Sequence, residues 1–128
     1  MTLSVQEFNQ KLTLRVLLGK IARGNSHPSY AELYSNAFYA INEILREEGL
    51  GDSAWAIRRG RRLYLLHKDT KRIICEVGII CEPYVEFCLI TLRGIIPATE
   101  TLQGLIQATS IRGVRRYALT YKERNKNE

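Results

Sequence analysis

The sequence predicts an α+β protein in which two N-terminal helices pack on a mostly antiparallel sheet of about five strands, with a third helix before the last strand. Three observations lead to this class. Two capping boxes each precede a segment with helical apolar spacing. The chain then changes to β-branched runs that short polar turns separate. Helices and strands also come in separate runs, which is typical of α+β proteins rather than of parallel α/β proteins.

The first helix is expected between Ser4 and Gly24. Ser4–Glu7 has the form of a capping box, in which the Ser hydroxyl accepts from the amide three residues on and the Glu reaches back. Gly is a common residue just after a helix, which suits Gly24. Apolar residues recur between these positions at mostly three- and four-residue steps, at Phe8, Leu12, Leu14, Leu17, Leu18 and Ile21.

The second helix is expected between Ser29 and Gly49. Ser29–Glu32 is a second capping box, and it follows a loop in which Pro28 restricts the residue before it. Gly49 marks the end of the helix. A wide apolar stripe lies between the two signals, at Leu33, Tyr34, Ala37, Phe38, Ile41, Ile44 and Leu45.

The second half of the chain contains the strands. Gly60 joins the first two, and Gly78 is expected to form a bulge in the third. The third and fourth strands are apolar on both faces, so they are candidates for central strands. The third helix contains Gly104, which is unfavourable inside a helix. The expected strands are 53–59, 61–67, 72–81, 84–93 and 114–122, and the third helix is 97–109.

These elements are expected to form one domain over residues 1–128. It consists of a helical hairpin over 1–51, a sheet with one helix over 52–122 and a frayed polar tail over 123–128. Apolar residues make up 45 % and charged residues 25 % of the chain, which argues against disorder as its main state. The apolar runs are far shorter than the roughly 18 residues of a membrane span, and no signal peptide is visible. We therefore expect a cytoplasmic protein that does not bind membranes.

Three cysteines, Cys75, Cys81 and Cys88, lie in apolar segments expected to be strands or their ends. Buried thiols in a reducing compartment are the simplest interpretation, with one disulfide and one free thiol as the alternative. No two of them are two to four residues apart, so the spacing does not indicate a zinc site. No cofactor is expected.

The net charge of +6 is concentrated in two stretches of the chain. Residues 52–74 hold seven basic and two acidic residues, and residues 112–128 hold six and two. Residues 1–51 are balanced with five of each, and residues 75–111 hold one base and four acids. The excess positive charge therefore belongs to the first β-hairpin and to the last predicted strand.

This pattern suggests a small non-catalytic nucleic-acid-binding or regulatory protein. Arginine offers a planar fork that suits phosphate, and nearby aromatic rings can stack on the bases of a single strand. A protruding hairpin could instead enter the groove of a duplex. The candidate phosphate contacts are Arg58, Arg59, Arg61, Arg62, Lys68, Lys71, Arg115 and Arg116. Trp55 and Tyr64 flank the first cluster, and Tyr117 and Tyr121 flank the second, with Tyr64 and Tyr117 as the expected stacking residues.

Two other functions compete with this hypothesis. The apolar strands and an uncovered sheet edge would also suit a homo-oligomer or a partner-binding module. The basic residues would then simply face solvent, or they would form ion pairs with the acids near the end of the second helix, Glu43, Glu47 and Glu48.

The third alternative is a metal-assisted hydrolase that uses Asp69, Glu76 and Glu86. Glu76 lacks the lysine two residues on that a common nuclease core has, and Glu76 and Glu86 could simply pair with Arg72 or Arg93. His27 and His67 are the only candidate bases among histidines, and no nucleophile motif accompanies them. The sequence therefore favours a protein that is not an enzyme.

Overall fold

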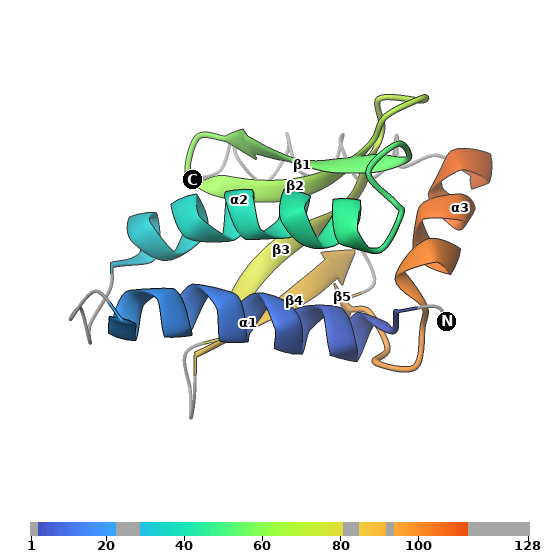
Figure 1. The fold of residues 1–128 in the computed structure, drawn as a ribbon. Coiled ribbons are helices and arrows are strands. Elements are labelled where there is room, and N and C mark those ends of the chain that lie inside the picture. The colour runs from blue at the N-terminus through green and yellow to red at the C-terminus, as the bar shows by residue number, and fades with distance from the viewer. Residues whose placement is uncertain (1–2, 23–28, 81–84, 92–93, 113–128) are drawn as a thin grey trace.

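The structure is a computed structural model that describes residues 3–22, 29–80, 85–91 and 94–112. Two long helices precede a five-stranded sheet, and a shorter helix follows it (Figure 1). The elements are α1 (Val5–Ala22), α2 (Tyr30–Glu47), β1 (Ala54–Arg59), β2 (Arg62–His67), β3 (Ile73–Ile80), β4 (Glu86–Thr91), β5 (Gly94–Ile95) and α3 (Leu102–Arg112).

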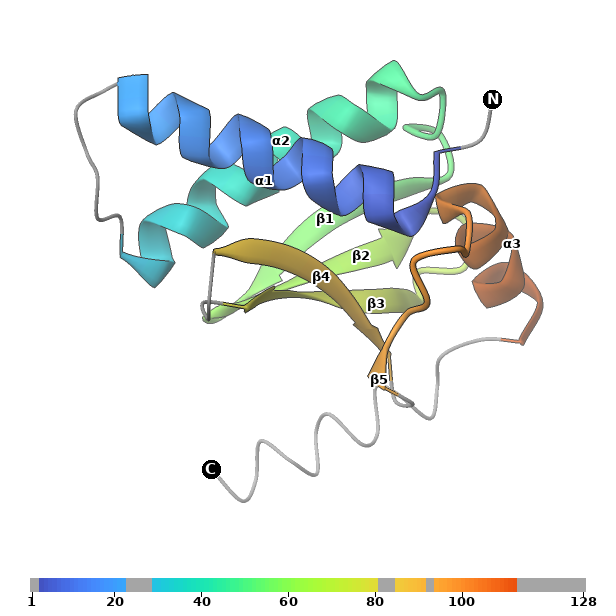
Figure 2. The same ribbon diagram turned by 90° about the horizontal axis from the view of Figure 1, so that it is seen from below.

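The predicted α+β class is confirmed. The strand order is β1-β2-β3-β4-β5, and every neighbouring pair is antiparallel. Helices α1 and α2 lie together on one face of this sheet, and α3 lies near one end of it (Figure 2). The fifth described strand, β5, precedes α3. The strand predicted over 114–122 falls beyond the part of the chain that the structure describes.

Both capping serines act as predicted. The Ser4 hydroxyl accepts from the Glu7 N–H at 3.1 Å, and the Ser29 hydroxyl accepts from the Glu32 N–H at 3.3 Å. The buried stripe of α2 also agrees with the sequence pattern. In α1, however, Leu14 is 57 % exposed, so its assignment to the core stripe is wrong. Because successive turns advance by 3.6 residues, the stripe that meets the sheet and α2 is Val5, Phe8, Leu12 and Val16.

Helix α3 begins five residues later than predicted. The residues before it form a turn in which the Glu100 N–H donates to the Pro97 carbonyl at 3.0 Å. The Thr101 hydroxyl then caps the helix by accepting from the Gly104 N–H at 3.0 Å. Gly104 consequently lies in the first turn, where a Cβ would come within 2.8 Å of that hydroxyl. The predicted apolar side of α3 is buried, at Leu102, Leu105 and Ile106.

Gly78 does not form the predicted bulge. It pairs regularly with Cys88, and the register irregularity lies near the start of β3, where Ile74 is the extra residue between the partners of Leu65 and Leu66. A Cβ on Gly78 would lie 2.6 Å from Ile90 Cδ1 and 3.2 Å from Cys88 Sγ. The glycine therefore makes room for side chains of the next strand.

A helix side chain binds the backbone at each side of the sheet. On β1, the Ala56 N–H donates to Asn42 Oδ1 of α2 at 2.8 Å. On β4, the Phe87 N–H donates to Thr13 Oγ1 of α1 at 3.1 Å. These bonds satisfy donors that an unpaired strand edge would offer to another chain.

The sheet has two different faces. The face under α1 and α2 carries the main core, which includes Leu63, Leu65, Cys75, Val77, Phe87 and Leu89. The opposite face, which we call the open face, carries a smaller cluster of Tyr64, Leu66 and Ile73 with Ile57 packed against it. Among the described helices, none is long and apolar enough to cross a membrane.

Candidate functional site

The arginine cluster lies at the turn between β1 and β2. Arg59 pairs with Arg62, so Gly60 and Arg61 form a two-residue loop. Gly60 has a φ of +61°, which the first central residue of the favoured hairpin turns requires. Alternation along β1 places Arg59 on the open face and Arg58 on the helix face. The turn therefore presents cations on both faces and at its tip.

Arg58, Arg59 and Arg61 are exposed, and none of them forms an ion pair with another described residue. Arg62 differs from them because it is half-buried and pairs with Glu76 across β2 and β3 at 3.5 Å. Arg62 is a partner of Glu76 that the sequence did not predict, and Arg93, one of the two predicted partners, lies outside the described residues. Within the described parts of the chain, three of the four hairpin arginines therefore have no acidic partner.

The acids that could have neutralised this cluster are bound elsewhere. Arg15 of α1 contacts Glu43 at 3.3 Å and also contacts Glu47. Lys11 of α1 contacts Glu48 at 2.9 Å. The Arg15 guanidinium lowers the pKa of Glu47, mainly through this hydrogen bond. The pairing of these acids with the hairpin arginines, which the sequence left open, is therefore not what the structure shows.

Trp55 lies at the other end of the hairpin from the arginines. The residue is 41 % exposed, and the Nζ atoms of Lys68 and Lys71 lie 5.3 and 5.4 Å from the centroid of its ring. Both distances are within the range of cation–π contacts. Lys71 adopts a φ of +59°, and its N–H donates to the His67 carbonyl at 2.9 Å, which closes the turn between β2 and β3. The aromatic ring of the edge strand β1 thus lies beside two cations of the turn between β2 and β3.

Tyr64 is fully buried on the open face, so the expectation that its ring stacks on a base does not fit this structure. Arg115, Arg116 and Tyr117 lie outside the described residues. Of the sequence-predicted site, the structure thus presents Arg58, Arg59, Arg61, Lys68 and Lys71 as exposed or partly exposed, with Trp55 beside the lysines.

The carboxylates proposed for a hydrolase do not converge. Asp69 lies in the turn after β2, Glu76 lies mid-strand opposite Ile90, and Glu86 lies opposite Ile80 at the start of β4. In the described parts of the chain, no group of three or more His, Cys, Asp or Glu side chains could hold a metal ion. The hydrolase hypothesis therefore has no site in these parts.

His67 is a structural residue. It is 5 % exposed, and its Nδ1 accepts from the Thr70 N–H at 3.3 Å. It stabilises the turn that carries the two lysines. His27, the other histidine, is not among the described residues.

Cys75 and Cys88 are free, buried thiols on opposite faces of the sheet. Burial raises the pKa of both, which disfavours the reactive thiolate. This agrees with the simpler of the two cysteine interpretations for these residues. Cys81 lies outside the described parts of the chain.

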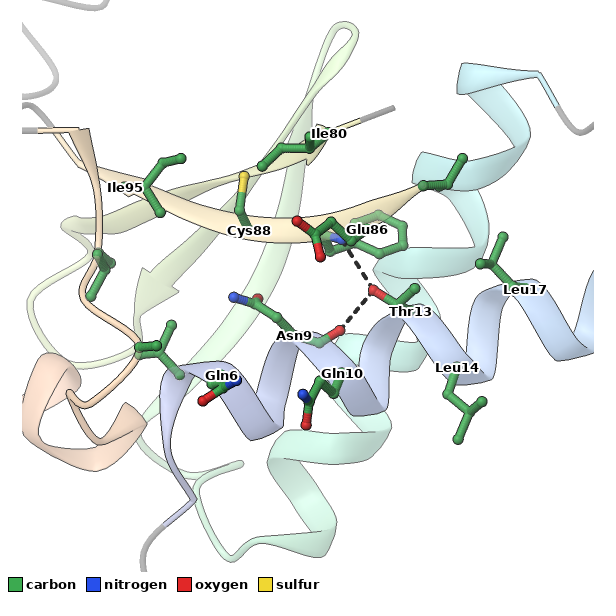
Figure 3. Close-up of a pocket in the computed structure, with 15 residues that line it drawn as sticks. Gln6, Asn9, Gln10, Thr13, Leu14, Leu17, Ile80, Glu86, Cys88 and Ile95 are labelled. Atoms are coloured by element: carbon green, nitrogen blue, oxygen red, sulfur yellow. Dashed lines mark hydrogen bonds between the residues drawn. The ribbon is translucent and has the colours of Figure 1, made fainter. Parts of the chain in front are cut away.

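A groove that the sequence analysis missed lies between α1 and the outer edge of β4. Its volume is about 660 Å³, which is within the range of small-molecule sites. Asn9 and Thr13 point from α1 toward β4, and Cys88, Ile80 and Ile95 lie on the other side of that strand (Figure 3). The groove therefore curves around the strand edge.

Asn9 gives this groove a polar group. Its Oδ1 atom is buried and has no hydrogen-bond partner within the described residues. The sequence carries a weak signal for the groove, because the polar residues Gln6, Asn9 and Thr13 recur at helical spacing beside the core stripe of α1. Periodicity alone does not show that this second stripe faces a strand.

Comparisons with protein-family models, with curated proteins and with solved structures found no match for this chain. The functional interpretation therefore depends on the geometry of these two regions.

Proposed function

We propose that the protein binds single-stranded nucleic acid along the β1–β2 hairpin. The observation that carries this proposal is that Arg58, Arg59 and Arg61 are exposed without an ion pair among the described residues, whereas α1 engages the acids of α2. Clustered cations repel one another, and phosphate relieves that repulsion. Trp55 would supply a stacking surface at the opposite end of the hairpin, with Lys68 and Lys71 beside it for further phosphates.

The hairpin is long enough for more than one nucleotide. Trp55 and Arg59 share one face of β1 and are four residues apart, which corresponds to roughly 13 Å along a strand. The phosphates of a single strand bound between them would contact the arginines at one end of the hairpin and the two lysines at the other, where a base could stack on Trp55. Rigid duplex cannot offer an unstacked base to Trp55, so we expect single strands to bind more tightly than duplexes of the same length.

The test measures the affinity of the full chain for labelled single-stranded and double-stranded oligonucleotides by fluorescence anisotropy. The variant Arg58→Ala/Arg59→Ala/Arg61→Ala should bind the single strand at least tenfold more weakly. The control Lys11→Ala/Arg15→Ala/Arg46→Ala removes the same number of charges from the helical side and should bind almost as the parent does. Equal losses in the two variants would mean that net charge, and not the hairpin, determines binding.

We propose a second binding function for the groove. It is carried by Asn9 Oδ1, which is buried and has no hydrogen-bond partner in the described parts of the chain. An apolar small molecule with one hydrogen-bond donor would fill the groove and satisfy this acceptor. The matched probes are 2-naphthol, which has the donor, and 2-methoxynaphthalene, which lacks it. The parent should prefer 2-naphthol by about five- to tenfold, which one hydrogen bond supports. The variant Asn9→Leu should lose this preference, and a parent without any preference would refute the proposal.

A further inference from the structure

The open face of the sheet is the face opposite α1 and α2. Strand register places Trp55, Ile57 and Arg59 of β1 on it. The neighbouring strands add Arg62, Tyr64, Leu66, Ile73, Glu76, Cys88 and Ile90. Helix α3 does not cover this face with its apolar side, because Leu102, Leu105 and Ile106 belong to the main core.

The centre of the open face is nevertheless buried. Tyr64 of β2 is 0 % exposed, Ile73 of β3 is 4 % exposed and Cys88 of β4 is 5 % exposed. A tyrosine on a bare sheet face would keep much of its ring in water, because its strand neighbours shield it only from the sides. At the edges of the same face, Trp55 is 41 % and Ile95 is 62 % exposed. This gradient indicates a cover over β2, β3 and β4 that does not reach the outer strands.

We infer that the C-terminal segment, residues 113–128, is this cover. Helix α3 contacts β2 and β3, so the chain continues from beside the strands that carry Tyr64 and Ile73. The sixteen remaining residues would reach roughly 24 Å as a helix or about 50 Å when extended, whereas the three covered strands span about 15 Å. Length therefore permits the contact in either conformation.

The composition of the segment matches the face. Val114, Tyr117, Leu119 and Tyr121 supply apolar side chains for the cluster around Tyr64. Arg115, Arg116 and Lys122 are opposite in charge to Glu86, which the register places on the open face at the start of β4. Glu76, on the same face, already pairs with Arg62. A second copy of the chain could cover the same face, and the test below distinguishes the two.

This arrangement would bring the two basic stretches of the sequence to one face. Arg59 and Arg62 lie on the open face, so a segment across β2–β4 would place its own arginines near the hairpin. The inference is independent of nucleic-acid binding, since it concerns only what covers the sheet.

The two buried thiols provide the test, because Cys88 lies on the open face and Cys75 faces the main core. The full chain with Cys81→Ser is labelled with a thiol reagent, and the rate at each cysteine is measured by mass spectrometry. Both should react at least 100-fold more slowly than in the unfolded chain. Adding Tyr117→Asp/Leu119→Asp/Tyr121→Asp should accelerate Cys88 at least tenfold and leave Cys75 within twofold.

The matched control places three aspartates in the polar end of the segment, Arg124→Asp/Asn125→Asp/Asn127→Asp, and should leave both rates unchanged. Unfolding of the triple aspartate variant would accelerate the labelling of Cys75 as well as of Cys88. In that case the milder variant Tyr117→Ala/Tyr121→Ala provides the test. Three results would overturn the inference: rapid labelling of Cys88 in the parent, an unchanged Cys88 rate in both segment variants, or protection of Cys88 that increases with protein concentration. The last result would assign the cover to a second copy.

Discussion

Replacing Thr13 by Val should destabilise the fold because it removes the acceptor for a strand-edge amide. The Thr13 hydroxyl accepts from the Phe87 N–H at 3.1 Å and donates to the Asn9 carbonyl at 2.8 Å. Valine keeps the shape of the side chain but leaves the Phe87 donor without this partner. An unsatisfied part-buried donor costs about 1–3 kcal/mol.

The effect can be converted to a melting temperature. For 128 residues, an unfolding entropy of about 2.1 cal/mol/K per residue makes each kcal/mol worth roughly 4 °C near the midpoint. Thr13→Val should therefore lower Tm by about 4–11 °C in calorimetry.

Thr13→Ser is the matched control, because it keeps the hydroxyl and loses only a methyl group. A Val variant that melts within 2 °C of the parent, or a Ser variant that is less stable than the Val variant, would refute the role assigned to this bond.

Three further predictions concern other parts of the fold. Phe8→Ala should cost about 3–5 kcal/mol in denaturant unfolding, since Phe8 is fully buried in the main core; a loss below 1 kcal/mol would contradict that packing. Gly60→Ala should cost about 1–2 kcal/mol because of the φ of +61°, and Gly60→Asn should cost less; equal stability of all three would exclude a left-handed residue at the turn. Arg15 lowers the pKa of Glu47, so the stabilisation from this pair is present at neutral pH and is lost as the pH falls through the lowered pKa. The stability difference between the parent and Arg15→Ala should accordingly shrink between pH 7 and pH 3, and a difference that persists at pH 3 would contradict this assignment.

Local signals in the sequence predict most of the elements. Ser4 and Ser29 are recognisable because a capping hydroxyl bonds an amide only three residues away. The turn at Gly60 is equally local, since its conformation restricts the residue type. These interactions depend on neighbours in sequence, so a pattern search finds them.

The wrong and missed predictions have a common physical cause, because the features concerned depend on contacts between residues that are distant in sequence. Gly78 suggested a bulge in the sequence. The structure explains the glycine by the side chains of β4 that approach it, and no local sequence pattern reveals these neighbours. Leu14 fits the helical spacing of α1, and only the packing direction of the helix shows that it faces solvent. Periodicity likewise cannot show that Asn9 and Thr13 meet the edge of β4 and line a groove.

The exposure of the candidate site residues was predictable only in part. Charge is concentrated in 52–74, and the structure exposes Arg58, Arg59 and Arg61 of that stretch. Sequence could not distinguish Arg62 from its neighbours, because the ion pair with Glu76 depends on the register of β2 and β3. It also could not show that Tyr64 is buried while Trp55 is exposed, since both alternate along strands in the same way.

The salt dependence of single-strand binding tests most directly whether the hairpin arginines contact phosphate. Each phosphate contact contributes about 0.7 to the slope of log affinity against log salt concentration for single strands. Arg58→Ala/Arg59→Ala/Arg61→Ala should therefore reduce the slope by about 2, so that between 50 and 200 mM salt the parent loses roughly twentyfold more affinity than the variant. The same slope in the parent and the variant would show that these arginines do not contact the nucleic acid.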